Sequence, residues 1–232
     1  MILIMTRLTA VLIALSLASC GVPRDPEGTL ERVRGGELRV GVSSSDPWAT
    51  WPGDDPSGVE VDLVEDFAAH IDSDVVWVEG SEAEVIEALE VGELDLVIGG
   101  LTSTSPWSKV AALTHPYITT KVVVAVPEGQ EVPDDIAELD VAVERGTAAA
   151  GILEKTDADP VIVEDVANAE GPVAVENWLL DDLGLIETGI TLGETDHVMA
   201  VRMGENAWMT ELERFLLERQ EVVERLLDEV TP

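Results

Sequence analysis

The sequence of 232 residues contains little cysteine, little lysine and few aromatic side chains. Its single cysteine, Cys20, excludes an internal disulfide framework. The only lysines are Lys109, Lys121 and Lys155, and all Lys and Arg together number 13 against 47 Asp and Glu, for a formal net charge of −34. A surface this acidic repels nucleic acid and anionic lipid, so both are unfavourable classes of partner.

The sequence also lacks an apolar run long enough to cross a membrane, which takes roughly 20 residues. The run at residues 8–17 is shorter, follows Arg7 and precedes Ala18-Ser19, which is the pattern of a signal peptide. Residues 17–21, Leu-Ala-Ser-Cys-Gly, are similar to a bacterial lipobox. By that resemblance, residues 1–19 are a removable leader and Cys20 is the lipid-modified first residue of the mature chain. The alternative is an ordinary exported protein with an incidental thiol.

The acidic residues are spread through the chain without forming a tail, which favours a solvated surface of the kind found in salt-adapted or acid-biased proteomes. A reservoir for cationic ligands or calcium is the alternative, but the chain has no Asp-x-Asp-x-Asp-Gly loop. His70, His115 and His197 are far apart and show no metal-ligand spacing. We therefore predict neither a metal site nor a cofactor.

The region after Cys20 predicts a tether followed by a folded α/β domain. Residues 20–36 are polar and contain two prolines and a Gly35-Gly36 pair, so we expect a lipid-anchored linker. From Glu37 onward, short β-rich runs alternate with helical patterns, which predicts parallel strands with crossover helices. The expected strands lie at residues 38–42, 75–78 and 94–98, and the expected helices at about 62–71 and 82–89.

A second lobe is predicted because this alternation restarts after a long apolar strand at residues 122–126. Its expected strands lie at residues 141–143 and 161–163, and its expected helices open near Thr147 and extend over about 178–183. A last strand near residues 198–201 leads into a terminal helix. Apolar side chains between Trp208 and Leu227 recur there at helical spacing, so one helix face should be buried.

Several motifs occur in a characteristic order. A strand at residues 37–42 precedes the helix start Gly-Val-Glu-Val-Asp-Leu at residues 58–63, and residues 92–102 combine Gly-x-x-Asp, a buried strand and a Gly-x-Thr turn. Pro116-Tyr117 and the segment at residues 141–149 follow. Together they resemble the bacterial extracellular solute-binding proteins of family 3, the polar amino acid receptors of ABC importers.

The resemblance implies an α/β, two-lobed periplasmic-binding-protein-like fold of type II, with a shortened second lobe. Its expected lobes are residues 37–121 with 199–232, and residues 122–198. Two crossover strands would join the lobes, and a ligand would bind in the cleft between them. The implied partners are a small-molecule ligand, a transporter permease and, through the lipid anchor, the outer face of the cytoplasmic membrane. The family's usual form is a monomer.

One departure from the family concerns the arginine that grips a ligand carboxylate beyond the Gly-x-Thr turn. That position falls on Trp107, and no arginine lies between Arg39 and Arg145. Lys109 substitutes only if the loop shifts by two residues. Trp107 suits a flat, apolar or cationic partner, and with Trp48 and Trp51 it would form an aromatic wall. The alternative is that each indole packs within its own lobe.

Polar candidates complete the expected ligand site. By the resemblance, Glu176 would pair with a ligand ammonium, although a surface glutamate before a helix is an equal alternative. Gly146 and Thr147, at a strand-to-helix turn, would offer N–H groups and a hydroxyl to a ligand oxygen, while Thr147 also caps the helix. Thr102 and Ser103 are candidates for the same polar role from the first lobe.

Three classes of function remain open from the sequence. The first is an exported solute-binding lipoprotein that has no catalytic activity and delivers a polar or cationic solute, such as an amino acid or an amine, to an ABC importer. The second is an accessory or sensor lipoprotein of the same fold with weak or no ligand binding. The third is a periplasmic dehydratase-like enzyme, which the acidic composition and the missing arginine disfavour because such substrates are anionic.

Overall fold

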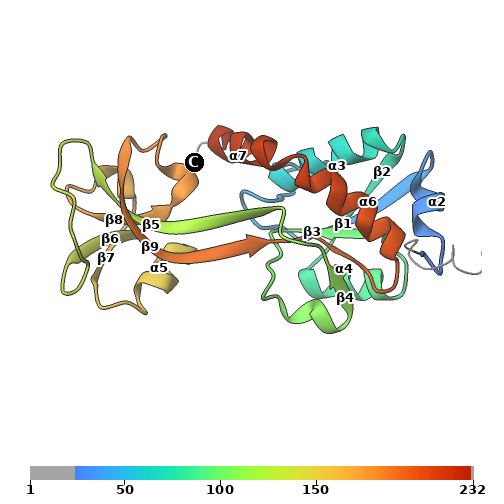
Figure 1. Ribbon diagram of the computed structural model, residues 1–232, viewed down its shortest axis with the longest axis horizontal. Helices are drawn as coiled ribbons and strands as arrows, with labels where there is room; N and C mark the ends of the chain where they lie inside the picture. The colour runs from blue at the N-terminus through green and yellow to red at the C-terminus, as the bar shows by residue number, and fades with distance from the viewer. Residues whose placement is uncertain (1–23, 231–232) are drawn as a thin grey trace, which may run out of the picture.

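The computed structural model describes residues 24–230, so Cys20 and the leader lie outside the described residues. The described chain forms two five-stranded sheets at opposite ends of an elongated molecule, joined by a long antiparallel strand pair (Figure 1). We call the part that contains the first sheet the first lobe and the part that contains the second sheet the second lobe.

The first sheet has the strand order β2-β1-β3-β10-β4. Strand β1 pairs in parallel with β2 and β3, whereas β10 runs antiparallel to β3 and β4. Its strands are β1 (Glu37–Val42), β2 (Asp74–Glu79), β3 (Leu96–Ile98), β4 (Ala111–Leu113) and β10 (Ala200–Arg202). Its helices are α2 (Thr29–Val33), α3 (Val59–His70), α4 (Glu82–Glu90), α6 (Asn206–Leu217) and α7 (Gln220–Glu229), with the 3-10 turn η1 (Pro106–Lys109).

Local sequence explains these helices. Helix α4 begins at a capping box, in which the Ser81 hydroxyl accepts from the Glu84 N–H and the Glu84 carboxylate accepts from the Ser81 N–H. Helix α3 buries a stripe of apolar side chains that includes Phe67. The Phe67 ring lies 5.4 Å from that of Trp208 and 5.1 Å from that of Phe215, so α3 and α6 share one core.

The second sheet has the strand order β7-β6-β8-β5-β9. Its strands are β5 (Ile118–Pro127), β6 (Asp140–Glu144), β7 (Asp159–Val163), β8 (Val173–Glu176) and β9 (Leu185–His197). Among the described residues, the α-helix of this lobe is the short α5 (Ala148–Leu153), with the 3-10 turns η2 (Val166–Asn168) and η3 (Asn177–Leu179). The helix expected at about residues 178–183 is therefore wrong beyond the single turn η3.

Strands β5 and β9 connect the lobes (Figure 1). Ile118 pairs with His197 beside the first sheet, and Val122 is the first residue of β5 that pairs with β8 of the second sheet. The ladder between β5 and β9 shifts register after Val122 and again after Val124, and such bulges bend and twist a strand pair. The lobe boundaries at residues 121 and 198 stay a prediction.

The linker expected over residues 20–36 is wrong for its described part, residues 24–36. Helix α2 lies in this segment and packs on the first lobe, where Val33 is 0% exposed. Asp25 accepts hydrogen bonds from the N–H groups of Ala207 and Trp208 at the start of α6. Glu205 in turn accepts from the N–H groups at residues 27 and 29. This reciprocal capping docks a segment whose composition predicts a tether.

The terminal helix expected from residue 208 onward is two helices, α6 and α7, separated at Glu218-Arg219. Helix α7 contacts α3 of the first lobe and η3 of the second.

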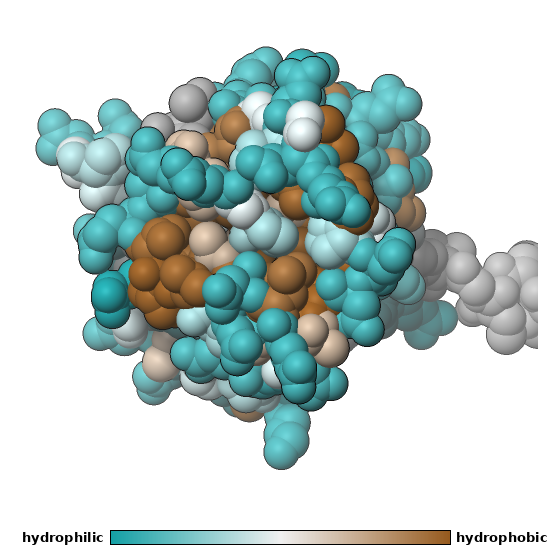
Figure 2. Space-filling model, turned by 90° about the vertical axis from the view of Figure 1, so that its left-hand side faces the viewer, coloured by the Kyte–Doolittle hydropathy of each residue, from teal (hydrophilic) through white to brown (hydrophobic). Residues whose placement is uncertain are grey.

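The end of the second lobe is largely hydrophilic with patches of apolar side chains (Figure 2). No helix among residues 24–230 has the length and apolarity needed to span a membrane.

Candidate functional site

The turn after β3 is held by a buried carboxylate, that of Glu60 at the start of α3. Its Oε2 accepts from the N–H groups of Gly99 and Gly100 at 2.6 and 2.9 Å, and its Oε1 accepts from the Tyr117 hydroxyl at 2.7 Å. Burial raises the pKa of Glu60, while these three hydrogen bonds oppose the shift. Glu60 therefore fixes the loop that carries Thr102 and Ser103.

The glycines of this turn are required by close packing. Gly99 has φ +143°, and a Cβ there would lie 2.2 Å from the carbonyl oxygen of Ser43. Gly100 has φ +68°, and its Cβ would lie 2.5 Å from Cδ1 of Trp48. The loops after β1 and β3 consequently pack against each other.

Trp48 lies inside this packing and is only 7% exposed. Its ring stacks on His197 at 3.8 Å between centroids, with an interplanar angle of 29°. His197 Nε2 is 3.0 Å from the Thr120 hydroxyl, whereas Nδ1 is buried without a hydrogen-bond partner among the described residues. Burial lowers the pKa of His197 to about 4, so the ring is neutral near pH 7. Trp48 thus supports the loops from beneath.

The three tryptophans of the predicted aromatic wall, Trp48, Trp51 and Trp107, do not share one packing cluster, and their role in ligand binding stays a prediction. Trp48 and Trp51 pack with one cluster of the first lobe, and Trp107 packs with another. Trp107 lies half-buried in η1 and donates its indole N–H to Glu82 of α4. The alternative considered from sequence, that each indole packs within its own lobe, describes this arrangement. Lys109 lies in the same turn and is exposed.

Thr102 and Ser103 attach the β3 loop to the strand pair between the lobes. Thr102 forms a β-bridge with His197, and the Ser103 N–H donates to the Asp196 carbonyl at 2.9 Å. The Thr102 hydroxyl is 3.0 Å from that of Thr104, and both are accessible. Polar groups of the first lobe therefore lie at the carboxyl end of β9.

Glu176 approaches the same strand pair from the second lobe. It ends β8 and pairs with Val122 of β5, four residues from Ile118, which is about 13 Å along an extended strand. Its side chain is half-buried and has no ion-pair or hydrogen-bond partner among residues 24–230. Burial raises the pKa of Glu176, because the carboxylate is desolvated without compensation.

Gly146 and Thr147 lie in the exposed turn between β6 and α5. The Thr147 hydroxyl accepts from the Ala150 N–H at 3.3 Å and donates to the Glu144 carbonyl at 2.9 Å. Thr147 is therefore the helix cap, as expected, and its hydroxyl proton is already engaged. A role for Gly146 and Thr147 in binding a ligand stays a prediction.

Sequence reasoning missed a serine-lined depression of about 490 Å³ on the first lobe. Ser43 and Ser44 follow β1, Glu79 ends β2, and Gly80 and Ser81 follow it, so the depression lies at the carboxyl ends of two parallel strands. Open α/β sheets bind ligands at this edge. The Ser-Ser-Ser run directly after a predicted strand was the available signal.

No group of three or more His, Cys, Asp or Glu side chains within residues 24–230 is arranged to hold a metal ion. The site offers hydroxyls, backbone N–H groups and one uncompensated carboxylate. These groups can bind a polar solute through hydrogen bonds and charge.

Solved structures share this fold. The L-cystine solute receptor of Neisseria gonorrhoeae in its unliganded open conformation matches with a TM-score of 0.68 at 15% identity, covering 86% of this chain and 97% of that chain. An ancestral cationic amino acid solute-binding protein matches with a TM-score of 0.66 at 19% identity, covering 87% and 98%. The two-lobed, periplasmic-binding-protein-like α/β fold predicted from the sequence is confirmed.

Curated relatives match only part of the chain. Membrane-bound lytic murein transglycosylase F of Shewanella oneidensis is 29% identical over 137 residues, which are 58% of this chain and 29% of that protein. The Shewanella baltica protein of the same name is 31% identical over 104 residues, 44% of this chain and 22% of that protein. The chain thus spans less than a third of the length of these relatives.

The sequence profile of one family covers nearly all of the folded part. Residues 38–224 match the bacterial extracellular solute-binding proteins, family 3. Apart from Glu37, this range includes both sheets, the strand pair between them, Thr102 and Glu176. The chain therefore belongs to the bacterial extracellular solute-binding proteins of family 3.

Proposed function

We propose that this protein is an exported receptor that binds a small cationic solute between its lobes and delivers it to an ABC importer. The observation that carries the proposal is the uncompensated carboxylate of Glu176. Glu176 ends β8 and pairs with Val122 of β5. Val122 lies about 13 Å along β5 from Ile118, and Ile118 pairs with His197, the residue that Thr102 bridges. A small solute can therefore contact groups of both lobes once the strand pair bends.

Charge favours a cation at Glu176. A half-buried carboxylate with no partner among the described residues is costly, and an ammonium or guanidinium group would compensate it. The first-lobe loops contain no arginine to receive an anionic group, because none occurs between Arg39 and Arg145. Two structural neighbours are consistent with a cationic ligand, since one is an ancestral cationic amino acid solute-binding protein and another, from Wolinella succinogenes, is complexed with lysine.

Export and anchoring are further parts of this proposal. Residues 1–21 carry the signal-peptide and lipobox-like patterns, which support attachment of Cys20 to lipid outside the cytoplasmic membrane. We infer binding without catalysis, because the family's members are solute-binding proteins. A permease and an ATPase encoded beside this chain would support the transport role.

A second candidate is an accessory or sensor lipoprotein whose ligand derives from murein. The partial matches to membrane-bound lytic murein transglycosylases favour it. This chain corresponds to less than a third of the length of those proteins. The same scaffold would then report on a solute and would not deliver it to a permease.

The two candidates separate in a thermal-shift screen of the chain from Gly21, which retains every described residue. The library contains amino acids, polyamines, quaternary amines and murein-derived peptides, at moderate and high salt. A ligand that binds the folded state raises the melting temperature by mass action. The receptor proposal expects a free amine or cationic amino acid to raise it. A response to murein peptides alone favours the accessory role, and no response from a well-folded protein contradicts the receptor proposal.

A further inference from the structure

A contact between the two lobes lies beside Glu176. Helix α7 extends from the first lobe toward the second and contacts both β5 and η3 (Figure 1). The turn η3 directly follows Glu176 and contains Trp178. Trp178 is half-buried and packs against the apolar cluster of the first lobe that includes Val223 and Leu227 of α7, which are 0% and 2% exposed. We call this packing of Trp178 on α7 the η3–α7 contact.

Trp178 packs differently from its neighbours in the sequence. Leu180 and Leu183 pack against an apolar cluster inside the second lobe, which includes Val123 and Val175. Trp178 lies two residues before Leu180 and packs instead against the cluster of the first lobe. Because an aromatic side chain buries a large apolar area, this packing contributes to the energy that holds the lobes in their arrangement.

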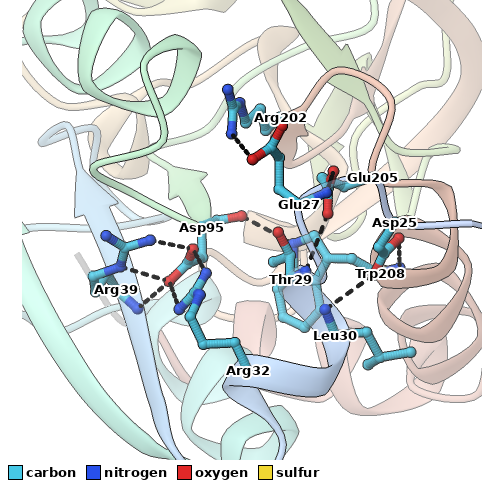
Figure 3. Close-up of polar contacts among 10 residues, drawn as sticks. All are labelled: Asp25, Glu27, Thr29, Leu30, Arg32, Arg39, Asp95, Arg202, Glu205 and Trp208. Atoms are coloured by element: carbon cyan, nitrogen blue, oxygen red, sulfur yellow. Dashed lines mark hydrogen bonds and ion pairs between the residues drawn. The ribbon is translucent and has the colours of Figure 1, made fainter.

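Helix α7 is a fixed support, because α6 anchors it to the first lobe. At the turn between the two helices, the Arg219 guanidinium carbon lies 4.5 Å from the centre of the Phe215 ring. At the start of α6, Asp25 accepts a hydrogen bond from the Trp208 N–H, and the Trp208 indole donates to the Asp95 carbonyl at 2.9 Å (Figure 3). The first lobe therefore holds the helix on which Trp178 rests.

The connection between the lobes is narrow at the level of this contact. Between Ile118 and Val122, β5 forms strand pairs only with β9 in the described chain. Two-stranded ribbons twist more than wider sheets, so this connection alone does not fix the angle between the lobes. The Asn177 side chain accepts from the Lys121 N–H at 2.7 Å, which ties η3 to the same ribbon. Packing of η3 on α7 therefore limits how the ribbon bends.

The η3–α7 contact also has space beside it. Trp178 and Leu227 line a cavity of about 250 Å³ together with Thr119 and Thr120 of β5. Protein interiors ordinarily contain few voids, and a filled interface resists displacement. The cavity gives η3 room to shift on α7, so the contact can be made in one arrangement of the lobes and lost in another.

From these contacts we infer that Trp178 is a positioning residue, which braces the second lobe against α7 and sets the angle between the lobes. The solute-free chain keeps the arrangement of the structure while this packing is intact, and the lobes sample a wider range of angles when it is lost. Glu176 lies two residues before Trp178, so the same contact sets how that carboxylate faces the first lobe. This last consequence alone rests on the proposed function.

The test measures the distance between the lobes in the solute-free chain from Gly21 by double electron–electron resonance. This chain contains no cysteine, because Cys20 is the only one in the sequence, so two spin labels can be placed without background. Glu87→Cys in α4 and Glu154→Cys after α5 supply exposed positions for them. We expect Trp178→Ala to broaden the distance distribution and to shift its mean by several ångströms, the scale of hinge and shear motions.

Matched variants separate the brace from a general loss of packing. Leu180→Ala truncates a half-buried side chain that packs within the second lobe and should leave the distances unchanged. Trp178→Phe keeps an aromatic ring and should shift the mean less than Trp178→Ala does. Leu227→Ala removes the opposite side of the contact and should reproduce the effect of Trp178→Ala, so the test holds even if one of these two variants folds poorly.

A distribution in Trp178→Ala that matches the parent chain would overturn the inference, and so would an equal shift in Leu180→Ala. The measurement is made without a solute, so its outcome is separate from that of the receptor proposal. Unchanged distances would leave a cation site at Glu176 standing, and an absent cation site would leave the brace standing.

Discussion

The hydroxyl of Tyr117 donates a 2.7 Å hydrogen bond to the carboxylate of Glu60, and both side chains are 0% exposed. The same carboxylate holds the N–H groups of Gly99 and Gly100. One buried acid therefore links the start of α3, the turn after β3 and the entry to β5.

Replacing Tyr117 by phenylalanine should lower the free energy of unfolding by about 2 kcal/mol, because a buried charged group loses one donor. Urea unfolding of the two proteins measures the difference. Thr50→Val is a suitable control, since its hydroxyl bonds Ser57 at the surface and its loss should cost little. Equal stability of Tyr117→Phe and the parent would show that Glu60 does not need this donor.

Stability should also depend on pH through His197, whose pKa is lowered by burial to about 4. Between pH 6.5 and 4 the unfolded chain takes up a proton at this residue and the folded chain does not, so stability falls as pH falls. A shift from 6.5 to about 4 corresponds to about 3 kcal/mol. Burial raises the pKa values of Glu60 and Glu176, and these groups act in the opposite direction.

A variant isolates the histidine from those carboxyl groups. His197→Phe keeps a ring against Trp48 and removes the titration, so its stability should fall less than that of the parent protein between pH 6.5 and 4. Denaturant unfolding at fixed ionic strength gives both profiles. Parallel profiles would mean that His197 titrates normally in the folded state, which would contradict its burial.

Docking of the N-terminal segment is tested by Val33→Ala. Val33 is 0% exposed in α2, so its truncation should destabilise the chain by about 2 kcal/mol through lost burial and a small cavity. Val132→Ala makes the same change at a side chain that is 46% exposed and should have little effect. If both variants unfolded at the same denaturant concentration, residues 24–36 would be the tether that their composition predicts.

The fold could be predicted from the sequence where local pattern and packing agree. The strand at residues 38–42 and the helix at about 82–89 were predicted from alternating β-rich and helical patterns, and the structure has β1 and α4 there. Strand β9 was missed, since its glycines and acids interrupt any alternation and its pairing with β5 is long-range. Helix α2 was missed because part of its capping is long-range, since the Thr29 N–H donates to Glu205, 176 residues away.

The candidate site was harder to predict, because burial and partners decide what a side chain is free to do. Trp107 was predicted to occupy the position of the missing arginine, and its indole N–H is committed to Glu82, a residue 25 positions away. His197 carried no sequence signal at all and stacks on Trp48. Glu176 remained the informative prediction, because the structure gives its carboxylate no partner among residues 24–230.

The most direct test of a cation site at Glu176 uses titration calorimetry with the cationic solute that the screen identifies. This solute is titrated into the parent chain, into Glu176→Gln and into Glu187→Gln. Glu187 is an exposed carboxylate of the same lobe, so its variant controls for the loss of one charge. We predict that Glu176→Gln weakens binding by at least about tenfold, while Glu187→Gln does not. Unchanged affinity in Glu176→Gln would contradict a cation site at this residue.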